Sequence, residues 1–341
     1  MSNLLVDFKK IHILKSMDFR KLTAGKDDDQ RRLDRILRIY LQDKSLGEIY
    51  KLIRKGLIKV NDKKTKPEVH INEGDIICIA EFLFEQEADT PLTDEKTSLK
   101  SPEALTIVFE NEHLLIIDKP YGRSVHGSEN DTNSGLDKDV LNYLKIAKKP
   151  VKESLSFRPG PLHRLDKNTS GLLVFSKSLE GAHWFTEHIK DHSIQKKYYG
   201  LAEGKIESEE AWEDKISNSE TTVQGFHTVT QNENGLTAQT IAKPVSYGKL
   251  GEKPITLVDF SIKTGRKHQI RIQSSLHGYP LAGDSAYGGS KNKALKREYY
   301  LQAYSLSFPE NPLGLPSEIK IKPSTDFINI LQYCEIKNPG L

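Results

Sequence analysis

The sequence lacks the features that mark secreted or membrane-spanning proteins. Only two cysteines occur among 341 residues, Cys78 and Cys334, and neither has another cysteine nearby. Such sparse cysteines support neither a disulfide framework nor a zinc site. No apolar run reaches about 18 residues, and the N-terminus lacks the apolar core of a secretory signal. These absences favour a soluble protein of the reducing cytoplasm, with no membrane partner.

Sequence motifs for cofactors are also missing. No phosphate loop or dinucleotide fingerprint is present, because Gly288-Gly289 lacks the flanking pattern. His188 and His192 have the i, i+4 spacing of a zinc protease, but Ile189 stands where its glutamate would be, and no third ligand is evident. We therefore expect no metal, no nucleotide cofactor and no other cofactor.

The charge is nearly balanced overall but unevenly distributed. The chain has 50 Lys/Arg and 47 Asp/Glu, with 36% hydrophobic residues, which is typical of a globular protein long enough for two domains. Between Arg31 and Asp75, however, 12 Lys/Arg stand against 7 Asp/Glu. This local excess indicates a polyanion partner, although a solvated basic face is the commoner origin of such a cluster.

The pattern divides the chain into four segments. Residues 1–29 have little periodicity and are expected to form a mobile leader. Residues 30–84 form a compact module, in which an apolar stripe over 33–41 and a capping box at Ser45–Glu48 predict two helices, and short strands follow at 57–60 and 76–79. The acidic, polar residues 85–102 read as a linker. Residues 103–335 form the main domain.

The main domain is rich in short apolar runs. Strands are predicted at 106–109, 114–117, 172–175, 198–201 and 255–262, and helices at 139–147 and 181–192. The strands outnumber the helices and do not alternate with them as βαβ units would. We therefore expect an α+β fold, with a mixed, mainly antiparallel sheet in the main domain and a small α/β domain at the N-terminus.

The most informative segment is a polar loop that runs directly into a hydrophobic strand, Pro161-Leu-His-Arg-Leu-Asp-Lys-Asn-Thr-Ser-Gly-Leu-Leu-Val-Phe175. Loops held by a rigid strand often carry catalytic groups. Taken alone, Asp166 could equally cap a turn, with Arg164 as its surface partner.

The segment does not stand alone, because it resembles the signature of the RluA-type pseudouridine synthases, and further elements of that family follow in order. These elements are Asp118-Lys-Pro-Tyr-Gly122, Val125-His-Gly127, Gln195-Lys-Lys-Tyr-Tyr-Gly-Leu-Ala202, Thr264-Gly-Arg-Lys-His-Gln-Ile-Arg271, Gly278-Tyr-Pro-Leu-Ala-Gly-Asp284 and Tyr287-Gly288. The resemblance extends from Thr106 to Pro309 and is greatest to the branch that acts on large-subunit ribosomal RNA.

The N-terminal module resembles the S-four RNA-binding domain. The resemblance rests on Arg32-Leu-Asp-Arg35, Leu52-Ile53, Gly56-Leu-Ile-Lys-Val-Asn61 and Gly74-Asp75. It implies that a basic helix face contacts RNA phosphates, which positions a protein without reading sequence. The candidate contacts are Arg32, Arg35, Arg54 and Lys55. A small regulatory module with solvated arginines is the alternative.

The family resemblance also implies roles for individual residues. Asp166 matches the catalytic aspartate, which would attack the ribose or abstract a proton from it. Arg271 matches the arginine that holds this carboxylate, ideally through paired hydrogen bonds, since an isolated buried carboxylate tends to become protonated. Arg266, in the same motif, is its rival for that role. Tyr198 matches the active-site tyrosine, which would stack on the base and help to move its proton.

A uridine in folded RNA must leave its stack before it can react. Arg164 is the candidate to fill the vacated space or contact a phosphate, His163 supports the loop beside it, and Lys119 and Lys267 are further candidate phosphate contacts. Leu165 should face the core. The chain departs from the family pattern at Lys267, Gln273 and Gln302, which puts substrate positioning in question.

The sequence thus predicts an RNA pseudouridine synthase, most simply a monomer, that modifies large-subunit ribosomal RNA. The alternatives are a synthase for transfer RNA and a non-catalytic RNA-binding factor for ribosome assembly. A nucleosidase or hydrolase would need a second carboxylate, for which Asp284 is the candidate.

Overall fold

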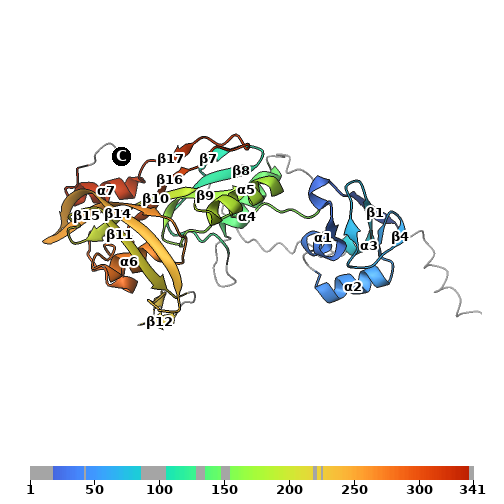
Figure 1. Cartoon of the computed structure of the whole chain (residues 1–341), viewed down its shortest axis with the longest axis horizontal. Helices are drawn as coiled ribbons and strands as arrows, with labels where there is room; N and C mark the ends of the chain where they lie inside the picture. Colours follow the sequence, from blue (N-terminus) through green and yellow to red (C-terminus); the bar gives the residue numbers. More distant parts are fainter. Residues whose placement is uncertain are drawn as a thin grey trace, which may run out of the picture. The chain divides into compact units, whose positions relative to one another are not determined.

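The computed structural model of the chain describes residues 18–41, 44–85, 105–127, 135–146, 154–217, 221–223 and 226–337. They fall into two compact units (Figure 1). The N-terminal unit combines residues up to Pro102 with the segment Pro150–Arg158, and the C-terminal unit takes Glu103–Lys149 and Pro159–Leu341. Each unit has its own hydrophobic core.

The N-terminal unit packs its helices against a four-stranded sheet of order β1-β6-β3-β4. The helices are α1 (Leu33–Tyr40), α2 (Leu46–Arg54) and the short α3 (Phe82–Glu85), and a 3-10 turn covers Lys26–Asp28. The sheet strands are β1 (Phe19–Thr23), β3 (Ile58–Val60), β4 (Lys63–Lys64) and β6 (Ile76–Ala80), while β2 (Arg31–Arg32) pairs with β5 (His70–Ile71).

The predicted capping box is present in this module, and a tight turn follows it. The Ser45 side chain accepts from the Glu48 amide and the Glu48 carboxylate accepts from the Ser45 amide, which closes the capping box at the start of α2. Asn61 and Asp62 both have positive φ (52° and 60°), the conformation that a two-residue hairpin between β3 and β4 requires.

The expected leader is shorter than predicted, and the expected linker falls almost wholly outside the described residues. Residues 1–17 and 86–102 lie outside the described residues, but residues 19–23 form β1, which pairs with β6, and Ala24 is buried. The module therefore begins well before residue 30. It also includes a segment from far along the chain, because Leu155 packs in its core and the Leu155 amide donates to Asp28.

The C-terminal unit is built on a nine-stranded sheet of order β11-β14-β15-β10-β16-β9-β8-β7, with β17 beside β16. The strands are β7 (Ile107–Glu110), β8 (Leu114–Lys119), β9 (Ser170–Ser176), β10 (Gln195–Glu203), β11 (Glu210–Ile216), β14 (Leu236–Leu250), β15 (Lys253–Ile262), β16 (Leu301–Ser307) and β17 (Glu318–Lys320). A separate hairpin joins β12 (Thr221–Val223) and β13 (Phe226–Thr228). Within this described sheet only β9 and β16 run parallel, so the predicted α+β class with a mainly antiparallel sheet is confirmed.

Helices cover both faces of this sheet. They are α4 (Leu136–Ile146), α5 (Leu179–Lys190), α6 (Gln269–Leu276) and α7 (Thr325–Tyr333), and a 3-10 turn covers Ser285–Tyr287. Alternate residues of β8 enter different cores: Leu115 and Ile117 pack with α4 and α6, whereas Leu114 and Ile116 pack with α5. The predicted strands and helices are present, but the sequence does not predict α6, α7, β11, β14, β16 or β17.

The central strands bring the chemical motifs together. The loop with Asp166 leads into β9, Tyr198 lies on β10, and β16 runs between these two strands. Gly171 at the start of β9 has φ of 113°, and a Cβ there would lie 2.1 Å from the Ala303 carbonyl oxygen of β16. Glycine is therefore required where the Asp166 loop joins the sheet.

Candidate active site

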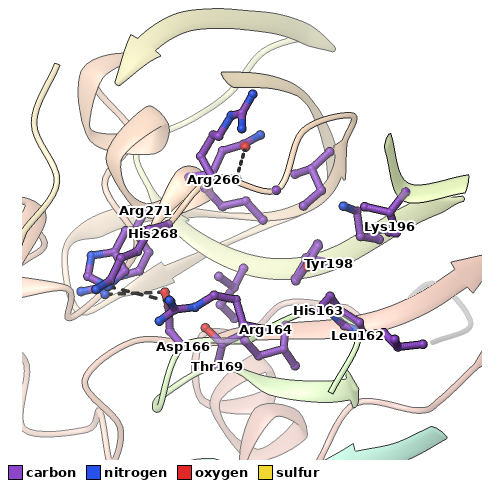
Figure 2. Close-up of a pocket in the computed structure, with 18 residues that line it drawn as sticks. Leu162, His163, Arg164, Asp166, Thr169, Lys196, Tyr198, Arg266, His268 and Arg271 are labelled. Carbon is purple, nitrogen blue, oxygen red and sulfur yellow. Dashed lines mark hydrogen bonds and ion pairs between the residues drawn. The ribbon is translucent and has the colours of Figure 1, made fainter. Parts of the chain in front are cut away.

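A cavity of about 270 Å³ opens in the C-terminal unit around Asp166. Its wall comes from the loop before β9, from β10, and from the loop between β15 and α6, with Ile189 of α5 and Leu301 of β16 (Figure 2). Among the described residues that line it, Asp166 is the one carboxylate. The volume suits a group of nucleoside size.

Asp166 sits on a loop that is fixed from behind. The Lys119 ammonium donates to the carbonyl oxygens of Pro120, Lys167 and Thr169 at 2.7–3.1 Å. The Thr169 amide donates back to the Asp166 carbonyl, which closes a tight turn. The Asp166 side chain is 17% exposed, so it faces the cavity while its backbone is held.

The expectation that Lys119 contacts phosphate is wrong. Its side chain is fully buried at the end of β8. Burial lowers the pKa of Lys119 to about 7, and the nearby charge of Asp166 acts in the opposite direction. Its ammonium serves as an internal cross-link of the loop that carries Asp166.

Arg271 projects from α6 toward Asp166, but its paired hydrogen bonds go elsewhere. Its Nε and Nη2 donate to the two carboxylate oxygens of Asp284 at 2.7 and 2.8 Å, while its Nη1 lies 3.8 Å from Asp166 Oδ2. The expected bidentate contact with Asp166 is therefore absent from this arrangement. Arg271 instead presents one edge of a guanidinium fixed by Asp284.

The Arg271 guanidinium also lies between two aromatic rings. Its central carbon is 4.4 Å from the ring centre of Tyr299 and 4.9 Å from that of Tyr287. Burial alone would lower the pKa of Arg271, but the hydrogen bonds to Asp284 and the nearby negative charges raise it above its ordinary value. The cation is thus permanent and rigidly placed.

His268 gives Asp166 a second nitrogen neighbour that was not predicted. Its Nε2 lies 3.8 Å from Asp166 Oδ1 (Figure 2). Its Nδ1 is 2.8 Å from the Tyr287 hydroxyl. The residue has positive φ (54°) at the turn that begins α6, which aims the ring back into the cavity. The sequence could have indicated His268, because it precedes Arg271 by three residues in the same motif.

Tyr198 lines the cavity from β10 and is 6% exposed. Burial, together with the charge of Asp166, raises the pKa of its hydroxyl well above the ordinary value. The hydroxyl is therefore protonated at neutral pH. A neutral ring in this position suits stacking on a base more than proton abstraction by a phenolate.

Of the remaining predicted residues, His163 supports the loop before β9, whereas Arg164 and Arg266 are exposed cations. His163 Nε2 accepts from the Val174 amide at 3.1 Å and its ring stacks on Phe185, so it supports the loop. Burial lowers the pKa of His163 to about 3. Arg164 and Arg266 both line the cavity and are exposed, with Arg266 Nε donating to the Thr237 carbonyl. Leu165 faces the core as predicted.

The departures from the family pattern fall mostly outside the cavity. Gln273 is fully buried and hydrogen bonds to Thr240 and Asp214, and Gln302 is bonded to the backbone at residues 322 and 324. Both act in the core, so they do not alter substrate positioning directly. Lys267 does line the cavity.

The candidate RNA contacts of the N-terminal unit are of two kinds. Arg35, Arg54 and Lys55 are exposed. Arg32, in contrast, forms paired hydrogen bonds with Asp34 at 3.1 and 2.7 Å, and Asp34 also accepts from the Tyr50 hydroxyl. Arg32 thus contributes to fixing the start of α1.

The described residues offer neither a metal cluster nor a membrane-spanning helix. Within those residues, no cluster of three or more His, Cys, Asp and Glu side chains could hold a metal ion. No described helix is both long and apolar enough to span a membrane.

Comparisons with known proteins agree with this geometry. The family described as RNA pseudouridylate synthase matches residues 113–276, and the S4 domain matches residues 31–77. The chain is 31% identical to the ribosomal large subunit pseudouridine synthase C of Salmonella typhi, over 84% of this chain and 88% of that protein. It is 29% identical to the enzyme of that name from Vibrio vulnificus, over 90% and 94%.

A solved structure supports the same fold. Human RNA Pseudouridylate Synthase Domain Containing 4 is 24% identical, with a TM-score of 0.55 over 69% of this chain and 95% of its own. The matched sequence family, the S4 domain and a cavity with one carboxylate lead to one conclusion. The chain belongs to the RNA pseudouridylate synthases, isomerases that act on uridine in RNA.

Proposed function

We propose that this protein converts specific uridines of large-subunit ribosomal RNA to pseudouridine, with Asp166 as its catalytic carboxylate. The observation that carries the proposal is a nucleoside-sized cavity with Asp166 as the one carboxylate among its described lining residues. The choice of RNA rests on relatives named ribosomal large subunit pseudouridine synthase C, which align over nearly their whole length. Transfer RNA is the second candidate.

A single carboxylate fits an isomerase that keeps its base. A glycoside hydrolase normally uses two carboxyl groups, one of them protonated. Asp284, the candidate second carboxylate, is 2% exposed and is occupied by Arg271. It is therefore not available as an acid facing the substrate, which argues against hydrolysis.

We assign the chemistry to three side chains. Asp166 breaks the bond between ribose and base, either by attack on the sugar or by abstraction of its proton. Arg271, 3.8 Å from Asp166, favours the ionised carboxylate. Tyr198 stacks on the detached base while it turns and rejoins through carbon-5.

Access to the cavity requires that the uridine leave its RNA stack. Exposed Arg164 and Arg266, which line the cavity, would contact the RNA backbone or occupy the space that the base vacates. The exposed Arg35, Arg54 and Lys55, with Arg32, would anchor the RNA through phosphates. Since one chain supplies Asp166, Tyr198 and Arg271, we also propose that the protein acts as a monomer. We propose a cytoplasmic location because its cysteines are sparse and far apart in the sequence.

The test is a carbodiimide reverse-transcription stop map of ribosomal and transfer RNA from cells with and without this gene. We expect specific stops in large-subunit RNA to disappear and to return with the wild-type protein. Asp166→Asn, which removes the charge and keeps the shape, should bind RNA normally but restore no stop. An unchanged map would favour a non-catalytic RNA-binding factor, and lost stops in transfer RNA would reassign the substrate.

A further inference from the structure

Lys196 is a buried lysine that the chemistry described above does not use. It lies on β10 two residues before Tyr198, so both side chains project from the same face of the strand into the cavity. Figure 2 places it beyond Tyr198, at the end of the cavity away from Arg271 and His268. Its exposure is 7%.

Nothing in the described part of the chain forms a hydrogen bond or ion pair with the Lys196 ammonium. Other buried lysines are different: Lys119 donates to three carbonyl oxygens, and Lys177 donates to the Glu110 carboxylate and the Asn111 carbonyl. A desolvated cation without compensation costs free energy, so a residue that serves only the fold should have a partner.

The groups that face Lys196 offer no compensating charge. His163, from the loop before β9, is neutral, since burial and the charge of Lys196 hold its pKa at about 3. The other polar lining residues from that loop and from the loop after β15 are Arg164, Arg266, Lys267 and His268, none of which carries a negative charge. The one lining carboxylate, Asp166, lies beside Arg271 and His268, away from Lys196 (Figure 2). On β10 itself the neighbour is neutral Tyr198, and α5 contributes apolar Ile189 to the wall.

Space next to the ammonium is kept open by a glycine. A Cβ at Gly265 would lie 3.3 Å from Lys196 Nζ, a closer approach than most side-chain contacts. The φ of Gly265 is not in the left-handed region, so the glycine is not required by the backbone there. This end of the cavity therefore pairs an uncompensated ammonium with a wall that lacks a side chain.

We propose that Lys196 binds a backbone phosphate of the RNA next to the target uridine, and thus forms an anion subsite of the cavity. The inference rests on the proposed function for the identity of the ligand. The ribose that Asp166 would act on carries a phosphate on its 3′ side and another on its 5′ side, so we place one of these two flanking phosphates at the Lys196 end of the same cavity. A phosphate is the RNA group that best compensates a desolvated ammonium, because charge-assisted hydrogen bonds are stronger than those to a neutral uracil oxygen.

The subsite has a pH signature. Burial lowers the pKa of Lys196 to about 8, so in the free protein the ammonium loses its proton as the pH rises through this value. Because kcat/KM reports the pKa values of the free enzyme, kcat/KM should fall above about pH 8. The ammonium contributes to binding rather than to bond breaking, so kcat should change much less.

The first experiment measures kcat and KM of the full chain on a large-subunit ribosomal RNA transcript, from about pH 6.5 to 9.5. For Lys196→Gln we expect kcat/KM at pH 7 to fall about tenfold to a hundredfold, mainly through KM, and the decline above pH 8 to disappear. Lys196→Arg should retain activity at pH 7 and remain active at pH 9, since guanidinium keeps its charge.

Two further measurements separate a phosphate contact from a structural role. Lys196→Gln should lower the salt dependence of RNA binding by about one unit of slope. It should leave the thermal midpoint unchanged or raise it, since an uncompensated buried charge is removed. The matched control is Lys177→Gln, which should lower the midpoint and leave the pH profile of kcat/KM unchanged.

The proposal is overturned if Lys196→Gln leaves KM and the salt slope unchanged, or if the decline above pH 8 persists in Lys196→Arg. A large loss of kcat at constant KM would equally contradict it. Binding of the transcript to Asp166→Asn, with and without Lys196→Gln, at pH 7 and pH 9, makes the test independent of turnover. If the wild type shows no turnover but binding depends on Lys196 and pH, the proposed function fails and the anion subsite stands.

Discussion

Asp166, the proposed catalytic carboxylate, illustrates how much of such a residue's placement is determined by groups, such as Lys119 and Asp284, that do not line the cavity with it. Lys119 and the turn closed by Thr169 hold its backbone, and Asp284 holds the arginine that faces its carboxylate. The motif led to Asp166, Tyr198 and Arg271, but these supporting contacts could not be read from it. A lysine before a proline looks solvated, and Asp284 reaches Arg271 across a loop.

Lys119→Met tests whether the loop must be held for chemistry. Methionine fills the space but removes the donor to the Thr169 carbonyl, at a cost of about 1–3 kcal/mol for a buried group left unsatisfied. The Lys167 carbonyl keeps its hydrogen bond from the Gly122 amide. We expect a lower thermal midpoint and a drop in kcat of about 100-fold, since small displacements of a catalytic group are costly. KM should change little. Steady-state kinetics and thermal melting measure the two effects.

Lys177→Met is the matched control for Lys119→Met. Lys177 is also buried, at 6% exposed, and its ammonium donates to the Glu110 carboxylate and to the Asn111 carbonyl, outside the cavity. Its loss should lower the thermal midpoint without a selective loss of kcat. If both variants reduce kcat in proportion to stability, the role assigned to Lys119 is only structural.

At the scale of elements, the sequence predicted those with a clean apolar period and missed those without one. Strand β1 reads Phe-Arg-Lys-Leu-Thr and lies at the edge of its sheet, with three of its five residues exposed. Helix α6 buries Gln269, Arg271 and Gln273, whose polar groups are satisfied by specific partners. Hydrophobic periodicity cannot detect an element whose buried residues are polar.

The segment around Leu155 is an element of the N-terminal unit that no local pattern predicts. Leu155 packs in that core, Ser156 accepts from Arg31 through its carbonyl, and Asp28 accepts from the Leu155 amide. Leu155→Ala should destabilise this unit by about 2–5 kcal/mol. Calorimetry should show the transition of the N-terminal unit shifted down and that of the C-terminal unit unchanged.

The control for Leu155→Ala is Leu46→Ala, because Leu46 is 40% exposed at the start of α2. It should shift neither transition appreciably, since exposed substitutions usually change stability by less than about 0.5 kcal/mol. If Leu155→Ala lowers only the transition of the C-terminal unit, the segment belongs there, and its assignment to the N-terminal core is incorrect.

On the scale of the whole molecule, two cores imply two functions that can be separated. The cavity is lined entirely by the C-terminal unit, whereas the excess of basic residues lies in the N-terminal unit. The sequence predicted this division through a change of composition, but it could not predict that residues after position 149 return to the first unit. That return affects how the two functions can be separated experimentally.

Deletion of residues 1–102 tests the division, and Leu155→Ser should accompany it because the deletion would otherwise expose Leu155. The truncated chain should keep its cavity and its turnover chemistry but bind RNA more weakly, because Arg35, Arg54 and Lys55 are lost. Each lost phosphate contact reduces the slope of log K against log salt by about 0.9, so the slope should fall by about two to three units. Binding measured over a range of salt concentrations gives this slope directly.

The full-length chain with Leu155→Ser is the control. An unchanged slope would mean that the N-terminal unit does not bind phosphates, and that the exposed cations of the C-terminal unit supply the RNA affinity.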